Sequence, residues 1–164
     1  MQNIVLNIIP YVAFFAALSY ATYTDIKTQK IKILTFPIAA IISLPCVIVS
    51  IVTQEYWSLF YDFLPLIIGA ITGFGIFFFI AFVGKGGGGD AIMNGCIGLV
   101  FGISRLMEIF IIVVIIIFIW TIYRYIMNKS GKKSYNLRQP YPLAPFVFTG
   151  YILVLLYYGL IYIF

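Results

Sequence analysis

Two aspartates, Asp25 and Asp90, are the residues of this sequence best suited to act together in catalysis. Asp25 follows a long apolar stretch, and Asp90 ends the glycine-rich run "GKGGGGD" before another apolar stretch. Two carboxyl groups held together share one proton, because like charges a few ångströms apart cannot both ionise. One carboxylate then activates a water molecule while the protonated partner polarises a carbonyl group. This chemistry hydrolyses peptide bonds, and the sequence leaves open which aspartate takes which role.

Other catalytic chemistries find little support in the residues. The chain has no histidine, and its two cysteines, Cys46 and Cys96, lie in apolar runs without a CxxC pair. A zinc site of the usual kind and a cysteine nucleophile with a base partner are therefore excluded. The glycines at 84, 86 and 89 match a dinucleotide-binding pattern, but no strand precedes them. Lys85 is followed by glycine, so a phosphate-binding loop also fails. We expect no metal, no cofactor and no nucleic-acid ligand.

The elements that must position these aspartates are membrane helices. The 164 residues are 63% hydrophobic and 9% charged, whereas a soluble domain has about a quarter charged residues. A bilayer-spanning helix needs about 20 apolar residues. The sequence predicts an all-α polytopic membrane protein, a bundle of six transmembrane helices that forms a single domain over residues 1–164. The predicted spans are Ile4–Tyr23, Ile33–Thr53, Phe63–Val83, Asp90–Ser104, Met107–Met127 and Ala144–Phe164.

The basic residues predict the orientation of this bundle, because cytoplasmic loops retain Lys and Arg. Nine of the ten fall in the first, third and fifth loops, and Arg105 alone falls on the other side. Both termini are therefore expected outside the inner (plasma) membrane. No basic segment precedes the first span, so we expect that span to be retained. Asp25 and Asp90 are then the only cytoplasmic carboxylates, because the outer side holds Glu55, Asp62 and Glu108.

The glycines around Asp90 have a physical interpretation in this setting. Irregular backbone at membrane depth is tolerated where it lies against protein or lines a wet cavity, and glycine permits it. Asp90 then opens a helix, where it acts as an N-cap alone or as a functional acid. Asp25 has a similar alternative, as a solvated flanking charge balanced by Lys27. Elsewhere, Gly69 with Gly73 and Gly98 with Gly102 form GxxxG pairs typical of helix packing.

Three motifs resemble those of the type IV prepilin peptidases. "GGGGDAIMNGCIGLVFG" contains the GxGD motif of Gly87, Gly89 and Asp90, and "DIKTQKI" resembles the family's first aspartate motif. "YPLAPFVFTGY" resembles its Pro-x-Gly/Ala-Pro segment through Pro142, Ala144 and Pro145. The motifs occur in the family's order. The sequence departs from the family pattern at two positions. Lys32 stands after Ile31 where the family commonly has proline, and Ile92 stands where the family often has lysine.

The resemblance implies a GxGD membrane aspartyl peptidase with Asp25 and Asp90 catalytic. Its partners would be the lipid bilayer and a prepilin or pilin-like substrate, cut at its leader peptide on the cytoplasmic face. Gly87, Gly89, Pro142 and Pro145 would position that substrate, although a plain helix-start proline pair explains the last two equally well. Nothing corresponds to the cysteine-rich segment of larger members. We therefore expect a peptidase-only form without an S-adenosylmethionine site, similar to tight-adherence pilus or archaeal preflagellin peptidases.

Three other functions remain open at this level. Presenilin-like proteases also use GxGD, but their chains are longer with more spans. A small proton- or cation-coupled transporter could use a glycine-rich break beside an acid, although the sequence shows no clear internal repeat. A catalytically idle pilus assembly factor would tolerate the two departures from the family pattern. The oligomeric state is left open.

Overall fold

In the computed structural model, residues 2–28, 31–53, 58–84, 87–129 and 143–163 are described. Nearly all of them are helical, and these ranges contain no strand. This confirms the all-α prediction. The elements are α1 (Gln2–Thr28), α2 (Thr35–Val52), a π-helical turn η1 (Leu59–Phe63), α3 (Leu64–Gly84), α4 (Gly88–Lys129) and α5 (Ala144–Ile163).

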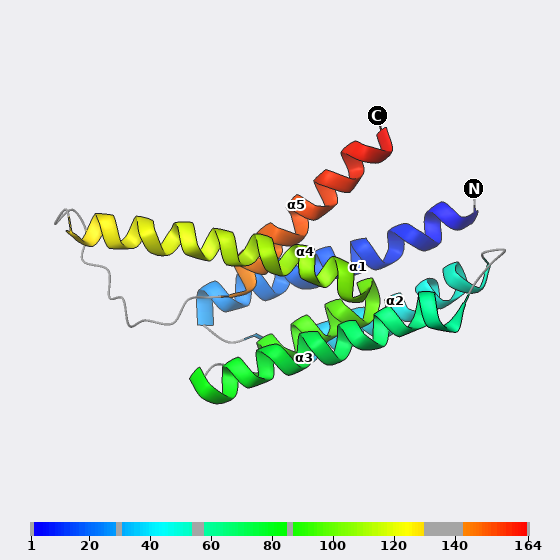
Figure 1. Cartoon of the computed structure of the whole chain (residues 1–164), viewed down its shortest axis with the longest axis horizontal. Helices are drawn as coiled ribbons and strands as arrows, with labels where there is room; N and C mark the ends of the chain where they lie inside the picture. The colour runs from blue at the N-terminus through cyan, green and yellow to red at the C-terminus, as the bar shows by residue number, and fades with distance from the viewer. Residues whose placement is uncertain (1, 29–30, 54–57, 85–86, 130–142, 164) are drawn as a thin grey trace.

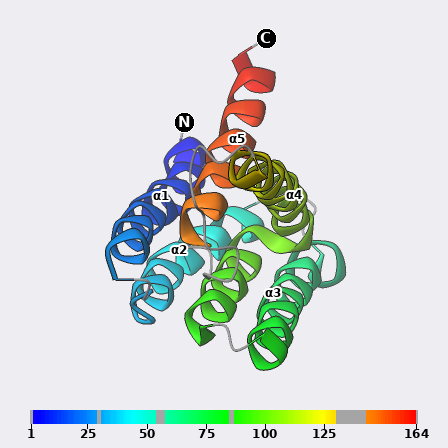
Figure 2. The same ribbon diagram turned by 90° about the vertical axis from the view of Figure 1, so that its left-hand side faces the viewer.

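The long element α4 consists of two helical segments that meet at Gly102. This glycine has φ 76° and ψ 173°, which interrupts the helix. The segment 88–101 runs beside α3, and the segment 103–129 then returns in the opposite direction (Figures 1 and 2). The two segments correspond to the fourth and fifth predicted spans. The break comes earlier than predicted, because a left-handed backbone is accessible to glycine at little cost.

The other helix ends differ from the predicted spans by a few residues. The largest difference is in α1, which continues past Tyr23 to Thr28, so Asp25 lies within the helix. The remaining helices, α2, α3 and α5, match their predicted spans within two residues wherever the structure describes them.

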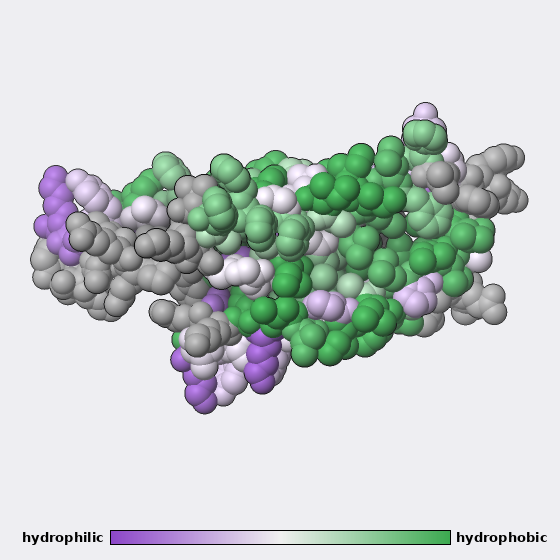
Figure 3. Space-filling view, turned by 90° about the horizontal axis from the view of Figure 1, so that it is seen from below, coloured by the Kyte–Doolittle hydropathy of each residue, from purple (hydrophilic) through white to green (hydrophobic). Residues whose placement is uncertain are grey.

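The helices alternate in direction, so the connections gather at two ends of the bundle. Both termini and the connection from α2 to α3 lie at one end in Figure 1. The connections from α1 to α2, from α3 to α4 and from α4 to α5 lie at the other. Figure 3 shows hydrophilic residues gathered toward this second end, while apolar residues cover much of the visible face of the bundle.

Close packing of α3 against the first segment of α4 depends on small residues. A Cβ atom added at Gly98 would collide with the backbone of Gly69, and one added at Gly73 would collide with the backbone of Asn94. Such contacts allow the two backbones to approach, which favours association where lipid removes the hydrophobic drive. The predicted packing role of Gly69, Gly73 and Gly98 is confirmed. Gly102 lies in the same close contact, because a Cβ atom added at Gly69 would collide with its backbone, and it also forms the turn between the two segments.

Apolar side chains fill the interior and also cover the outside. The buried core includes Phe14, Leu18, Phe36, Met93 and Tyr151, and Tyr151 also donates a hydrogen bond of 2.9 Å to the Tyr11 carbonyl oxygen. Large apolar side chains elsewhere remain exposed, among them Ile41, Ile71, Phe82 and Phe118. Soluble monomers rarely expose such extensive apolar surface, so these helices are those of a membrane protein.

Three helical stretches in the described ranges are long and apolar enough to cross a membrane. They are Thr35–Val52, Phe60–Phe82 and Gly88–Lys129, the last containing the Gly102 break. Within α5, the apolar stretch Ala144–Tyr158 is shorter than these three.

Candidate active site

Asp25 lies in the last turn of α1 and is almost completely buried, with 6% of its surface exposed. Its Oδ2 atom accepts a hydrogen bond of 3.0 Å from the backbone N–H of Ala144, the first residue of α5. The Leu143 backbone amide also stabilises the carboxylate. Burial opposes these amides and outweighs them, so the pKa of Asp25 is raised above its ordinary value. The Asp25 carboxylate is therefore shielded from solvent and bound by backbone amides. The alternative of a solvated flanking charge is wrong.

Asp90 lies in the first turn of α4 and is partly buried. The helix begins at Gly88, so Asp90 is its third residue and the N-cap interpretation is wrong. The Asp90 backbone N–H already donates to the Gly87 carbonyl oxygen at 3.2 Å, because glycines 88 and 89 adopt helical backbone angles. A carboxylate in this first turn is favoured by the helix dipole. The position leaves the Asp90 side chain available for another partner.

The structure brings the two aspartates together at the end of the bundle where α1 ends and α4 begins. Their carboxyl groups lie close enough for the charge of Asp25 to act on Asp90. The two residues are 65 positions apart in the sequence, with α2 and α3 between them, so only the folded bundle creates this pair. Chemically, such a pair can hold one proton between two carboxyl groups and polarise a water molecule beside them.

Gly89 connects the two aspartate motifs. A Cβ atom at Gly89 would lie 3.2 Å from the Cβ of Ile31, which follows Asp25 by six residues. Cβ atoms at Gly87 or Gly88 would meet nothing within 4 Å. A side chain at position 89 would therefore press against Ile31, while the surroundings of Gly87 are open.

The proline-containing segment is only partly described. Pro142 lies outside the described residues, and Pro145 is the partly buried second residue of α5. The contact with Asp25 comes from the backbone of Leu143 and Ala144 between the two prolines. The segment thus reaches the site through the backbone of Leu143 and of Ala144, a residue of the motif, and not through the two prolines expected to position the substrate.

Asn94 is a site residue that the sequence analysis did not identify. It is 3% exposed, and its side-chain amide donates a hydrogen bond of 2.9 Å to the Asp90 carbonyl oxygen. Its spacing of four residues from Asp90 places both on one helix face, which is a usable signal. The backbone amides at 143 and 144 leave no comparable signal, because any residue except proline carries that donor. No cluster of three potential metal ligands from His, Cys, Asp or Glu occurs among the described residues.

A comparison with known protein families identifies the family of this chain. The model of the type IV leader peptidase family matches residues 12–122, more than half of the chain. The chain belongs to the type IV leader peptidase family. The matched region of this leader peptidase family member contains both aspartates, Ile31 and the glycine-rich segment, and ends before α5. No curated protein and no solved structure matches the chain.

Family membership identifies the chain as a leader-peptidase-type protease and confirms the resemblance predicted from the motifs. It also agrees with the apolar helices in indicating a membrane protein. The Ala144 contact with Asp25 lies outside the family match, so it comes from the structure alone.

Proposed function

We propose that this protein removes the leader peptide of a prepilin or pilin-like membrane protein, with Asp25 and Asp90 as the catalytic pair. One aspartate takes a proton from a water molecule, and the other, protonated, donates a hydrogen bond to the scissile carbonyl. Attack of the water gives a tetrahedral intermediate, which collapses as the leaving amine gains a proton. The observation that carries this proposal is the electrostatic interaction between the carboxyl groups of Asp25 on α1 and Asp90 on α4.

The bundle is proposed to cross the inner membrane six times, with the two segments of α4 counted separately. The alternating helix directions support this arrangement. So does the distribution of the basic residues, which favours a cytoplasmic aspartate end and both termini outside. A substrate would then be cut at the cytoplasmic edge of its own membrane helix.

Substrate positioning is assigned to the glycine-rich segment and to the start of α5. Gly87 has open surroundings beside the aspartates, and Gly89 holds Ile31 close. Pro145 opens α5 beside the Ala144 amide that binds Asp25, and Pro142 is included through the family motif. Gly87 and Leu143 lie just before α4 and α5, outside the helices, and an extended leader segment is proposed to pair with this non-helical backbone.

The direct test is co-expression with a candidate prepilin, followed by measurement of leader removal. Asp25→Asn and Asp90→Asn should each lower cleavage at least a hundredfold, since each removes a group needed for proton transfer. Asp62→Asn is the matched control, because Asp62 lies in η1 at the other end of the bundle. Cleavage that survives both site substitutions would refute the proposal.

A further inference from the structure

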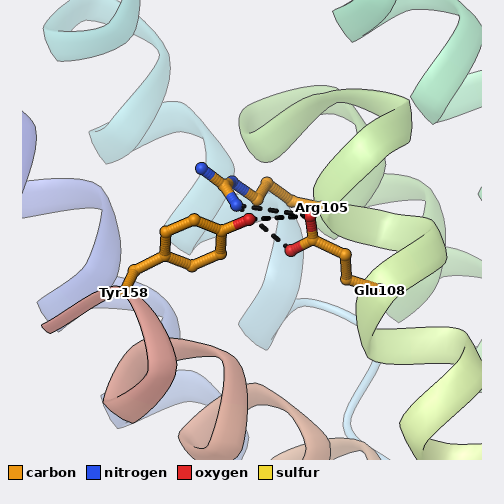
Figure 4. A network of polar contacts seen from close by, with 3 residues as sticks. All are labelled: Arg105, Glu108 and Tyr158. Atoms are coloured by element: carbon orange, nitrogen blue, oxygen red, sulfur yellow. Dashed lines mark hydrogen bonds and ion pairs between the residues drawn. The ribbon is translucent and has the colours of Figure 1, made fainter. Parts of the chain in front are cut away.

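A second polar cluster lies at the end of the bundle opposite the aspartates. Arg105 follows the Gly102 turn, and its Nη1 atom pairs with the Glu108 carboxylate at 3.1 Å. The Tyr158 hydroxyl donates to the same carboxylate at 2.8 Å. The Arg105 guanidinium also lies over the Tyr158 ring, 3.4 Å from its centroid (Figure 4). These contacts fix the guanidinium in one orientation.

Among the residues that the structure describes, the Arg105 guanidinium donates hydrogen bonds to Glu108 alone, through Nη1, so one of its edges is left for another partner. In Figure 4 a second guanidinium nitrogen points away from Glu108, and no dashed line reaches it. Asn7 offers a second donor to the cavity that Arg105 lines. Its side-chain oxygen accepts a hydrogen bond of 2.7 Å from the Ser50 hydroxyl, which leaves the amide nitrogen of the side chain as the donor. Within the described part of the chain, the Asn7 amide nitrogen has no hydrogen-bond partner. Arg105, Asn7 and Ser50 all line one cavity of about 320 Å³, so its polar part favours an anion.

The rest of this cavity is apolar, and a second apolar cavity adjoins it. The first cavity is lined by Val47, Ile51 and Val100 besides its polar residues. The second, of about 290 Å³, is lined mainly by apolar and aromatic side chains from α1, α4 and α5. Tyr11, Phe101 and Arg105 line both cavities. The Tyr11 and Phe101 rings lie 5.0 Å apart, so this ring pair borders two clefts that share one cationic group.

We propose that this end of the protein binds a diacyl phospholipid. The phosphate contacts Arg105 and the Asn7 amide, and one acyl chain enters each cleft beside the Tyr11–Phe101 pair. The apolar outer surface of the helices places lipid next to both clefts. Arg105 follows the Gly102 turn, so it lies at the end of the 88–101 segment opposite Asp90. Glu108 neutralises part of the arginine charge, so directed hydrogen bonds, more than net charge, select the phosphate.

This inference goes beyond the proposed peptidase function and is independent of it. The test uses the full chain, purified in detergent and stripped of lipid, with binding followed by native mass spectrometry and thermal unfolding. The probes are phosphatidylglycerol, a diacylglycerol with the same chains, and inorganic phosphate. Phosphatidylglycerol should bind at least tenfold more tightly than diacylglycerol, because a hydrogen bond to a charged group is worth about that factor. Inorganic phosphate alone should not raise the unfolding temperature.

Substitutions then locate the site. Arg105→Gln should weaken phosphatidylglycerol binding about tenfold and leave diacylglycerol binding unchanged. Val47→Phe should weaken binding of both lipids, because the added ring fills one cleft. If Arg105→Gln unfolds the protein by leaving Glu108 unpaired, the double variant Arg105→Gln/Glu108→Gln replaces it. Lys129→Gln, which removes a cation at the end of α4, is the control and should change nothing.

Three results would overturn the phospholipid site. They are equal binding of the two lipids, full stabilisation by inorganic phosphate alone, and unchanged phosphatidylglycerol affinity in both Arg105 variants. The same measurements on Asp90→Asn protein separate this site from the peptidase proposal, since lipid binding should persist there without cleavage.

Discussion

The backbone N–H of Ala144 donates a hydrogen bond of 3.0 Å to the carboxylate of Asp25, 119 positions earlier in the chain. The first amides of a helix have no partner within that helix, and a side-chain oxygen commonly supplies one. Here the oxygen comes from a different helix. The contact therefore fixes the start of α5 to the end of α1 and holds the Asp25 carboxyl group in one orientation.

Removal of that donor should affect catalysis through Asp25. Ala144→Pro removes the N–H at a helix position where proline is tolerated. Cleavage should fall about tenfold, because a hydrogen bond to a charged group is lost. The pH profile should also shift upward, since the carboxylate loses a stabilising contact. Ala144→Gly keeps the donor and is the control. Identical rates and pH profiles for the two variants would show that the Ala144 amide has no role in setting Asp25.

Stability should depend on pH through Asp25. Burial raises its pKa above the ordinary value of 3.8, so folding favours the protonated form. The wild-type protein should therefore lose stability relative to Asp25→Asn as pH rises from about 4 through the raised pKa. Below the ordinary value both proteins carry a neutral group, and their difference should be constant. Thermal unfolding of both proteins across this pH range measures the effect. The opposite slope would mean that the amide contacts outweigh burial.

Substitution within the glycine-rich segment should be tolerated unevenly. Gly89→Ala places a Cβ 3.2 Å from the Ile31 Cβ, whereas Gly88→Ala meets open space. The methyl group of Gly89→Ala should push apart the two segments that carry Asp25 and Asp90. Cleavage should therefore drop about tenfold or more in this variant. Gly88→Ala should stay within about twofold of wild type. Prepilin cleavage rates at equal protein levels test this, and similar losses in both variants would count against the Ile31 contact.

Helix packing should depend on Gly98 and be indifferent to Gly75. Gly98→Ala forces the α3 and α4 backbones apart at Gly69 and should lower the free energy of unfolding by about 1–3 kcal/mol. Gly75→Ala on α3 meets nothing within 4 Å and should be neutral or slightly stabilising, because alanine favours the helix. Unfolding in mixed micelles gives both values. Equal effects would show that the close approach of the helices contributes nothing.

The sequence by itself was sufficient for the helical class and for the family. Apolar runs of bilayer length predict helices through local hydrophobicity alone, and the GxGD run with its companion motifs led to the family that the chain belongs to. Two details at individual residues came only with the structure. Asp90 is the third residue of its helix, and Gly102 turns the chain as well as packing against Gly69. Both details depend on backbone angles, which a glycine-rich sequence permits but does not determine.

The geometry of the aspartate pair came only from the tertiary structure. Asp25, Asp90 and the Ala144 amide lie on three helices, and their approach depends on how those helices pack against one another. The same holds for Arg105 and Tyr158, which meet between α4 and α5. Local sequence determines which segments become helices because those hydrogen bonds are made within a segment. Contacts between helices depend on the packing of the whole bundle, and no single segment encodes them.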